Sequence, residues 1–177
     1  TIRAGVFKDN QLVSSIFSEI INYHKAVKGS VTINPTPHTS YNAGGNQALI
    51  NGILGSDKRN GDKEWLGFWG DDVEININLN EETTINSITT RFYNTNGQWI
   101  YAPKKIDIAY SLDGNKHHLL KEVELSSDDR IVKVRIEFEA IKAKYLKIFV
   151  TNYGGISEGK QGAGNKAWTF IDEIIVE

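Results

Sequence analysis

Hydrophobic and polar residues alternate with a period of two over much of the chain. Every second residue of the segment 73–79 is apolar, and the same alternation recurs at 106–108, 132–138 and 146–150. Successive side chains of a β-strand point to opposite faces of the sheet, so this pattern is typical of a strand with one face in a core and one in water. The pattern predicts several half-buried strands.

Residues that favour turns separate these segments. Asn96-Gly97, Asp113-Gly114, Gly154-Gly155 and the polar run 126–129 all lie between predicted strands. Glycine, asparagine and aspartate adopt the backbone angles that tight turns require. Short strands that follow one another without helices predict an all-β fold, an antiparallel sandwich or barrel.

The first 46 residues of the chain are patterned differently. Arg3–Phe7 and Gln11–Ser15, on either side of a Lys-Asp-Asn turn, predict a hairpin. Ile16–Val27 fits a helical face or a strand, and extended structure is favoured because its neighbours are β. The segment 32–46 contains Pro35 and two adjacent glycines, and it is predicted to be a loop that enters the main domain.

Composition narrows the class of protein. The chain has 177 residues, 40% of them hydrophobic and 24% charged, which suits one folded domain with a short appendage. The net charge of −2 gives no basic excess for nucleic acid. No apolar run is long enough to span a bilayer, so membrane insertion is not expected. The absence of cysteine excludes disulfides and thiolate chemistry, and the start without Met suggests a fragment of a larger protein.

The closing segment 167–176 places acidic residues within a hydrophobic strand. The upstream loop 46–56 offers backbone carbonyls, an amide and a hydroxyl. Oxygen ligands of these kinds suit a hard cation. The two segments together are therefore a candidate cation site.

Six short motifs resemble one family in their order along the chain. They are Ala48–Gly52, Trp65–Phe68, Asp72–Leu79, Trp99–Pro103, Ser111–Gly114 and Asp172–Ile174. Together they resemble a discoidin-like domain, the coagulation factor five/eight type C domain, in the form of the carbohydrate-binding modules appended C-terminally to bacterial β-hexosaminidases. The resemblance implies an antiparallel β-sandwich, a jelly roll of about eight strands, over residues 31–177. Residues 1–30 resemble the tail of a small β domain that precedes such modules, or form an N-terminal extension.

The family resemblance implies a structural calcium ion. Carried over by position, the ligands would be the residues Ala48, Asn51, Leu54, Ser56 and Glu173. Asn51 stands where the family usually has aspartate, which removes one negative charge and weakens the site. The alternative is that Gly52 and Gly55 form an ordinary turn and that Glu173 accepts hydrogen bonds from backbone amides.

The family's sugar site lies in loops at one end of the sandwich, where aromatic rings stack on sugar rings and polar groups bind hydroxyls. By position, the resemblance implies the contact residues Trp65, Arg91, Tyr93, Asn94, Asn96 and Tyr153. Packing in the core is the competing interpretation for each tryptophan, and it is favoured for Trp99 and Trp168.

No catalytic constellation stands out. The four histidines lack the spacing of metal ligands, and the acidic pairs lie at turns or strand ends. The sequence predicts a non-catalytic carbohydrate-binding module of a secreted, periplasmic or cell-surface bacterial glycosidase. Its expected partners are a glycan, of galactose or N-acetylhexosamine type by analogy with the family, and the parent catalytic domain. The alternative is a structural accessory domain that braces the catalytic domain without binding sugar.

Overall fold

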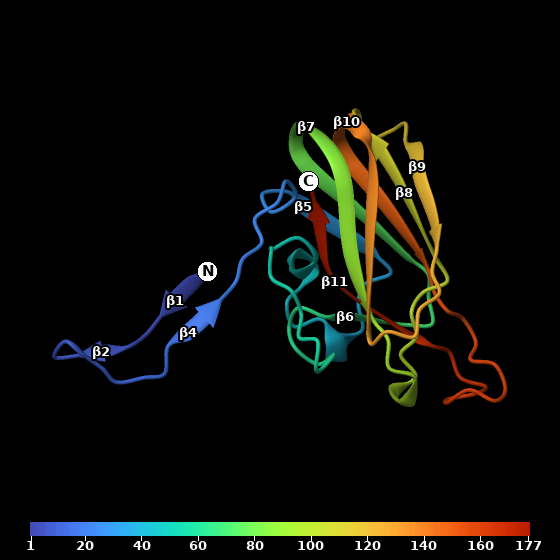
Figure 1. Cartoon of the computed structure of the whole chain (residues 1–177). Coiled ribbons are helices and arrows are strands. Elements are labelled where there is room, and N and C mark those ends of the chain that lie inside the picture. Colours follow the sequence, from blue (N-terminus) through green and yellow to red (C-terminus); the bar gives the residue numbers. More distant parts are fainter.

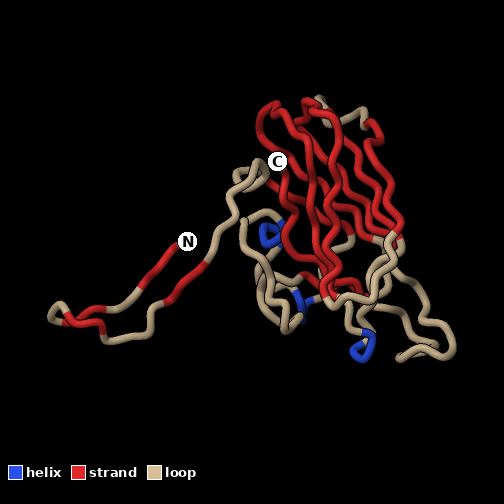
Figure 2. The backbone as a smooth tube through the Cα atoms, viewed as in Figure 1, coloured by secondary structure: helices blue, strands red, loops and turns tan.

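The computed structural model describes all of residues 1–177, and strands carry the fold (Figures 1 and 2). The strands are β1 (Ile2–Ala4), β2 (Phe7–Lys8), β3 (Gln11–Leu12), β4 (Phe17–Glu19), β5 (Ser30–Asn34), β6 (Leu66–Trp69), β7 (Val73–Tyr93), β8 (Lys105–Ser111), β9 (His118–Glu124), β10 (Ile131–Thr151) and β11 (Trp168–Val176). The helices are three short 3₁₀ turns, η1 (Thr39–Tyr41), η2 (Asn46–Leu49) and η3 (Asn96–Gln98). None of them is long or apolar enough to cross a membrane.

Two layers of antiparallel strands form the sandwich, which confirms the predicted fold class. The long strands β7 and β10 run through both layers. In the first layer, the first half of β7 pairs with β5 on one side and with the second half of β10 on the other. The second half of β10 also pairs with β8, and β8 pairs with β9, which is the edge strand. Beyond register shifts in β10, the other halves pair with each other, and β11 and β6 complete the second layer.

The predicted alternation places the apolar side chains between the layers. Ile75, Ile77, Ile106, Ile148 and similar residues form one core cluster of 27 buried residues. Their polar sequence neighbours face outward, as the period of two requires. At about 25 cal/mol per Å² of apolar surface, burial of this cluster is the main term that stabilises the sandwich.

The segment 32–46 was predicted to be a loop, and this prediction is wrong at its start. Residues 30–34 form β5, which pairs with β7 from Ser30 opposite Asn78 to Asn34 opposite Glu74. Val31 and Ile33 are buried while their neighbours are exposed. The alternation was present in the sequence, but the prolines that follow β5 outweighed it in the prediction.

Residues 1–23 form an arm that leaves the sandwich (Figure 1). The predicted hairpin is confirmed as β2 and β3, joined through Asp9 and Asn10 with positive φ angles of 48° and 62°. Two central residues of this kind match the right-handed twist of the flanking strands. Further along the arm β1 pairs with β4, so part of the ambiguous segment after residue 15 is extended. Contact with the sandwich core begins at His24 and Ala26, which are both buried.

Candidate functional site

Three loops meet at one end of the sandwich, below the ends of β7, β8 and β10 in Figure 1. They enclose a hollow of about 170 Å³. The residues that line it are Asn94, Asn96, Tyr101, Ala102, Pro103, Lys104, Leu125, Ser126, Ser127, Asp128, Tyr153 and Lys160. Of the six residues predicted to bind sugar, Asn94, Asn96 and Tyr153 come together here.

An aromatic pair forms one wall of this hollow. The rings of Tyr101 and Tyr153 are stacked, with centroids 4.5 Å apart and planes 27° from parallel. Tyr101 is buried, and its hydroxyl donates a hydrogen bond to the carbonyl of Gln161 at 2.8 Å. This contact fixes the ring that lies beneath Tyr153, so the half-buried Tyr153 presents a supported ring edge and face to the hollow.

Charge in the hollow comes from lysines and one aspartate. The ammonium group of Lys160 hydrogen-bonds to the Tyr153 hydroxyl, and this bond raises the pKa of Lys160. Burial, followed by the neighbouring Tyr153, raises the pKa of the Tyr101 hydroxyl. Lys160 therefore stays positively charged and the Tyr101 hydroxyl stays neutral at physiological pH. Lys104 and Asp128 add one charge of each sign to the lining.

The two asparagines differ in what they can do. The Asn94 amide nitrogen donates to the carbonyls of Ser127 and Asp129 at 3.0 and 3.1 Å, and its oxygen accepts from the Ala102 amide at 3.4 Å. Asn94 is therefore a positioning residue that ties two of the loops together. Asn96 lies in η3 with an exposed side chain that makes no hydrogen bond to the protein, so its amide is available to a ligand.

Three of the predicted sugar contacts are wrong because their side chains are buried. Trp65 is 0% exposed, Tyr93 2% and Arg91 7%. The Trp65 and Tyr93 rings pack edge to face at 5.2 Å, and the indole nitrogen donates to the carbonyl of Ser56 at 3.1 Å. The loop that contains Trp65 covers the outer face of β7, so that end of the strand is enclosed on both sides.

Arg91 makes a buried ion pair with Asp172 instead of a ligand contact. Its Nε and Nη2 atoms lie 2.9 and 2.7 Å from Asp172 Oδ2. Nη2 also donates to the carbonyl of Gly55 at 2.8 Å, and Nη1 donates to Asp57 at 3.0 Å. Burial raises the pKa of Asp172 to about 7, while the Arg91 guanidinium acts in the opposite direction. The network joins β7, β11 and the loop 50–57.

Of the two tryptophans that were expected in the core, Trp99 differs from the prediction, whereas Trp168 packs against a buried aromatic cluster as expected. Trp99 is 38% exposed at the end of η3, so its assignment to the core is wrong. Its indole lies 6.4 Å from the ring of Trp69. Trp168 is half-buried and packs against Trp69 at 4.7 Å. Trp99 is therefore an aromatic side chain at the loop end that sequence reasoning assigned to packing.

The loop and the closing strand predicted to hold calcium do meet. Glu173 Oε2 accepts hydrogen bonds from the backbone amides of Gly52 and Ile53 at 2.9 and 3.1 Å. Its other oxygen, Oε1, lies 2.6 Å from His24 Nε2. Both carboxylate oxygens thus have N–H partners, as the alternative interpretation expected.

Two more of the predicted ligands, Asn51 and Ser56, are also engaged in hydrogen bonds within the protein. Asn51 Oδ1 accepts from the Ile53 amide at 2.8 Å, and its nitrogen donates to Glu64 at 2.7 Å. Ala48 is buried in η2, Leu54 is exposed, and the Ser56 carbonyl accepts from Trp65. No three acidic or histidine side chains gather in a group suited to a metal. Asn51 and Glu173, as they are hydrogen-bonded here, do not fit a calcium ion.

His24 and Asp172 are the structural residues that sequence reasoning missed. Their partners Glu173 and Arg91 had been assigned to calcium and to sugar. Two consecutive acids in a hydrophobic strand are a usable signal, because a buried carboxylate requires a partner. The register shift between Ile171 and Ile174 in β11 allows Asp172 and Glu173 both to be buried.

The geometry defines a β-sandwich with a ligand-sized hollow among its end loops. The family model described as the F5/8 type C domain matches residues 28–174. The chain therefore belongs to the F5/8 type C domain family, which confirms the predicted resemblance. A search of curated protein sequences finds no match.

Several solved structures share the fold. A carbohydrate-binding module of Clostridium perfringens, CpGH89CBM32-5, solved with GalNAc-beta-1,3-galactose, is similar with a TM-score of 0.56 and 17% identity, over 87% of this chain and 99% of that one. A chitosan-binding module from Paenibacillus sp. IK-5 has a TM-score of 0.55 and 18% identity, over 88% of this chain and 98% of that one.

A larger enzyme also contains this fold. A mutant GH29 fucosidase of Ruminococcus gnavus, solved with fucose, has a TM-score of 0.56 and 17% identity over 87% of this chain. The match spans 26% of the fucosidase. At these identities the likeness establishes the fold alone.

Proposed function

We propose that this chain is a non-catalytic carbohydrate-binding module that holds a parent glycosidase close to its glycan. The observation that carries the proposal is the stacked Tyr101–Tyr153 pair beside the free amide of Asn96 at the loop end. A sugar ring has apolar C–H faces for an aromatic wall and hydroxyl groups for amides and ammonium groups. The similar modules from C. perfringens and Paenibacillus, named for carbohydrate binding, support this function.

The size of the hollow bears on the affinity. A volume of about 170 Å³ is below the range of about 300–1,000 Å³ typical of drug-sized ligands, so it suits a single sugar residue. Such a site binds weakly. Linkage to a catalytic domain makes weak binding useful, because it raises the effective concentration of enzyme at the glycan. We propose a galactose or N-acetylhexosamine residue as ligand, and a secreted or cell-surface bacterial glycosidase, of β-hexosaminidase type, as parent.

A titration with galactose, N-acetylgalactosamine and N-acetylglucosamine tests the proposal. Tyr153→Ala should reduce the affinity for the bound sugar about tenfold without unfolding the domain, with a small fall in melting temperature because the stacking on Tyr101 is lost. Tyr23→Ala is the matched control, because Tyr23 is 69% exposed on the arm, remote from the loop end. Equal affinity of wild type and Tyr153→Ala for every sugar would refute the site.

A second function is supported by the arm. Its large side chains are exposed, including Val6 at 63%, Phe7 at 65% and Ile20 at 62%. A surface of this kind marks a contact with another protein segment. The alternative proposal is therefore a structural accessory domain whose arm, with residues 1–30 as the tail of a preceding β domain, braces the catalytic domain. Absence of binding to all glycans of an array, with a stable complex between module and catalytic domain, would favour it.

A further inference from the structure

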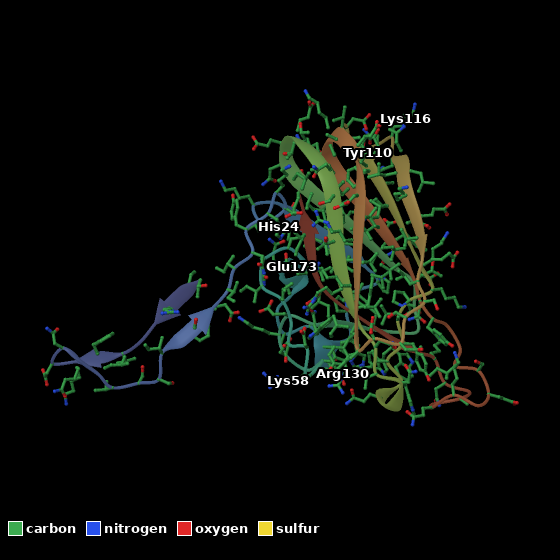
Figure 3. The ribbon with its side chains drawn as sticks, viewed as in Figure 1. His24, Lys58, Tyr110, Lys116, Arg130 and Glu173 are labelled. Carbon is green, nitrogen blue, oxygen red and sulfur yellow. The ribbon has the colours of Figure 1, made fainter.

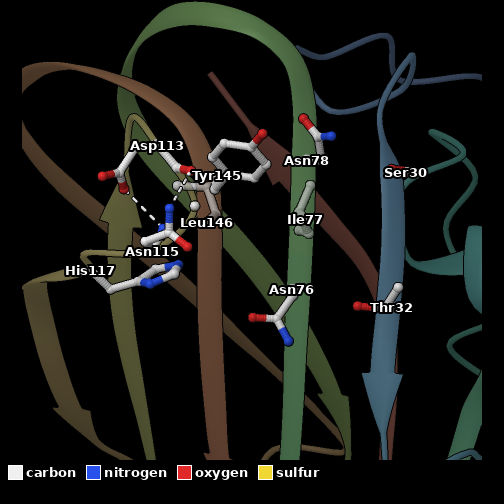
Figure 4. Close-up of a pocket in the computed structure, with 11 residues that line it drawn as sticks. Ser30, Thr32, Asn76, Ile77, Asn78, Asp113, Asn115, His117, Tyr145 and Leu146 are labelled. Carbon is white, nitrogen blue, oxygen red and sulfur yellow. Dashed lines mark hydrogen bonds between the residues drawn. The ribbon is translucent and has the colours of Figure 1, made fainter.

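A second hollow lies on the outward face of the first layer. It measures about 430 Å³ and is lined by residues of β5, β7 and β10 and by the turn between β8 and β9 (Figure 4). Lys116 marks that turn at one end of the sandwich, and Arg130 marks the loop end opposite (Figure 3). The two hollows therefore lie at different ends of the molecule.

Strand pairing places three side chains of this hollow in one row. Ser30 of β5 lies opposite Asn78 of β7, and Asn78 lies opposite Tyr145 of β10. These residues point outward because their neighbours Ile77 and Leu146 are buried in the core. A second row starts with Thr32 opposite Asn76. The floor of the hollow is thus a rigid sheet.

The polar atoms of the floor keep capacity for a ligand. Asn78 Oδ1 accepts from the Asn80 amide, which leaves its NH₂ group free to donate. Asn76 donates to Glu74, which leaves its amide oxygen free to accept. A ligand rich in hydroxyl groups can use both kinds of atom, since each hydroxyl is both donor and acceptor.

The turn that closes the hollow is fixed by its own hydrogen bonds. Asp113 Oδ1 accepts from the amides of Asn115 and Lys116 and from the Ser111 hydroxyl, while Oδ2 has no protein partner. These amides, first that of Lys116, lower the pKa of Asp113 to about 2. Gly114 has a φ of +78°, and a Cβ there would lie 3.3 Å from the Tyr145 ring. The turn and the ring are therefore in close contact, and the ring forms an apolar wall beside the amides.

Charge selects among the possible ligands. The lining contains the Asp113 carboxylate and the His117 imidazole, and neither lysine nor arginine. An acidic sugar would be repelled by the carboxylate and would find no lysine or arginine in the lining to pair with. The volume lies within the range of about 300–1,000 Å³ for small-molecule sites.

We propose that this hollow is a second saccharide subsite, which binds an uncharged pyranose unit of the glycan across β5, β7 and β10. The ligand class rests on the proposed carbohydrate-binding function, but the location is independent of the loop-end site. Two separate subsites on one module would let it hold a branched or folded-back glycan, or two chains of a glycan surface, with the gain in avidity that linked sites give.

Nuclear magnetic resonance of the full ¹⁵N-labelled chain tests the subsite. The probes are galactose, N-acetylgalactosamine, N-acetylglucosamine and N,N′-diacetylchitobiose, at up to about 50 mM, which is ample for a millimolar site. The expected result is that at least one probe shifts the side-chain amides of Asn76 and Asn78 and the backbone amide of Gly114. Galacturonic acid, an acidic sugar, should leave these signals unchanged.

Variants separate this subsite from the loop-end site. Ser30→Trp fills the hollow from the edge strand with a residue that favours strands, and Tyr145→Ala removes the wall. Each variant should lower about tenfold the sugar affinity that is measured from the shifts at Asn76 and Asn78, and should leave the affinity measured at Asn96 unaffected. Tyr153→Ala should do the reverse. Shifts on the sheet without any at the loop end would support this subsite and refute the loop-end site. Unchanged sheet signals with every probe would overturn the subsite, whatever the loop end shows.

Discussion

Replacement of Arg91 by methionine should destabilise the fold strongly. Arg91 was a sugar contact by sequence reasoning, and the structure buries it against Asp172. Arg91→Met keeps most of the side-chain volume and removes the charge. It leaves Asp172, which is 0% exposed, with the Gly55 amide as its remaining hydrogen-bond donor at 2.9 Å.

The magnitude follows from the cost of an unpaired buried charge. Loss of one partner of a buried ion pair costs about 3–5 kcal/mol. Domains unfold with about 5–15 kcal/mol, so this is a large share of the total. For a chain of this size the melting temperature changes by about 2–4 °C per kcal/mol, which gives a fall of about 6–20 °C. If Arg91 were an exposed sugar contact, the change would be below about 1 kcal/mol.

The effect should also depend on pH, with a definite sign. Burial raises the pKa of Asp172 to about 7, and loss of the opposing Arg91 charge raises it further. When the pKa of a carboxyl group is higher in the folded state than in the unfolded state, the stability of the fold falls as pH rises from the unfolded pKa to the folded pKa. Arg91→Met should therefore lose more stability at pH 8 than at pH 5.

Urea unfolding followed by tryptophan fluorescence measures the change, since the Arg91 guanidinium lies 5.4 Å from the Trp65 ring. Arg135→Met is the matched control: Arg135 has a half-exposed side chain paired with Glu137 and Glu177, and a loss of at most about 1 kcal/mol is expected. If Arg91→Met lowers the free energy of unfolding by less than about 1 kcal/mol, the structural role of the buried Arg91–Asp172 ion pair is refuted.

Three further changes have definite expected outcomes. The pKa of Asp113 is lowered to about 2 by backbone amides, so its stabilising effect is present above about pH 4 and lost as pH falls toward 2; Asp113→Asn should abolish that part of the acid dependence in urea unfolding. Because N–H groups occupy both oxygens of Glu173, the melting temperature should be equal in EDTA and in calcium, and a calcium-dependent rise would restore the predicted metal site. Deletion of residues 1–20 should leave the far-ultraviolet spectrum of the sandwich and its melting temperature nearly unchanged, because core contacts begin at His24; a large fall would show that the arm stabilises the module.

The fold was predictable because alternation and turn residues agree. The strands that carry the sandwich alternate with a period of two, and glycine or asparagine stands between them. One of the strands that escaped prediction, β5, is short and runs directly into Pro35. The first part of its partner β7 was recognised, so the missing information was the pairing of segments forty or more residues apart, which local pattern does not contain.

The loop-end site was predictable only in part. The resemblance identified Asn96 and Tyr153 by their position in the family's contact loops. Burial of Arg91 and Tyr93 was not foreseen. The run 88–93, Ile-Thr-Thr-Arg-Phe-Tyr, is buried throughout. Three consecutive residues in it are polar, so it is not the continuous hydrophobic run that indicates a strand covered on both faces. The cover is supplied by the segment that contains Trp65, and no local pattern places that segment over β7.

The assignment of Glu173 shows where sequence reasoning ends. A calcium cage and a carboxylate that accepts backbone hydrogen bonds need the same loop, the same glycines and the same acid. The calcium site and the hydrogen-bonded carboxylate differ in what the carboxylate oxygens contact. Here one oxygen of Glu173 is hydrogen-bonded to His24, which lies 149 positions earlier in the chain. Asp172 likewise depends on Arg91, 81 positions away. Both acids lie at the register shift of β11. Glu173 links β11 to His24 at the start of the domain, and Asp172 links β11 to Arg91 of β7. Arg91 in turn binds the loop 50–57 through the carbonyl of Gly55. These two networks keep β7 and β11 in fixed register. The loops that hold Asn96 and Tyr153 extend from these strands, so the loop-end site can be formed before any ligand arrives.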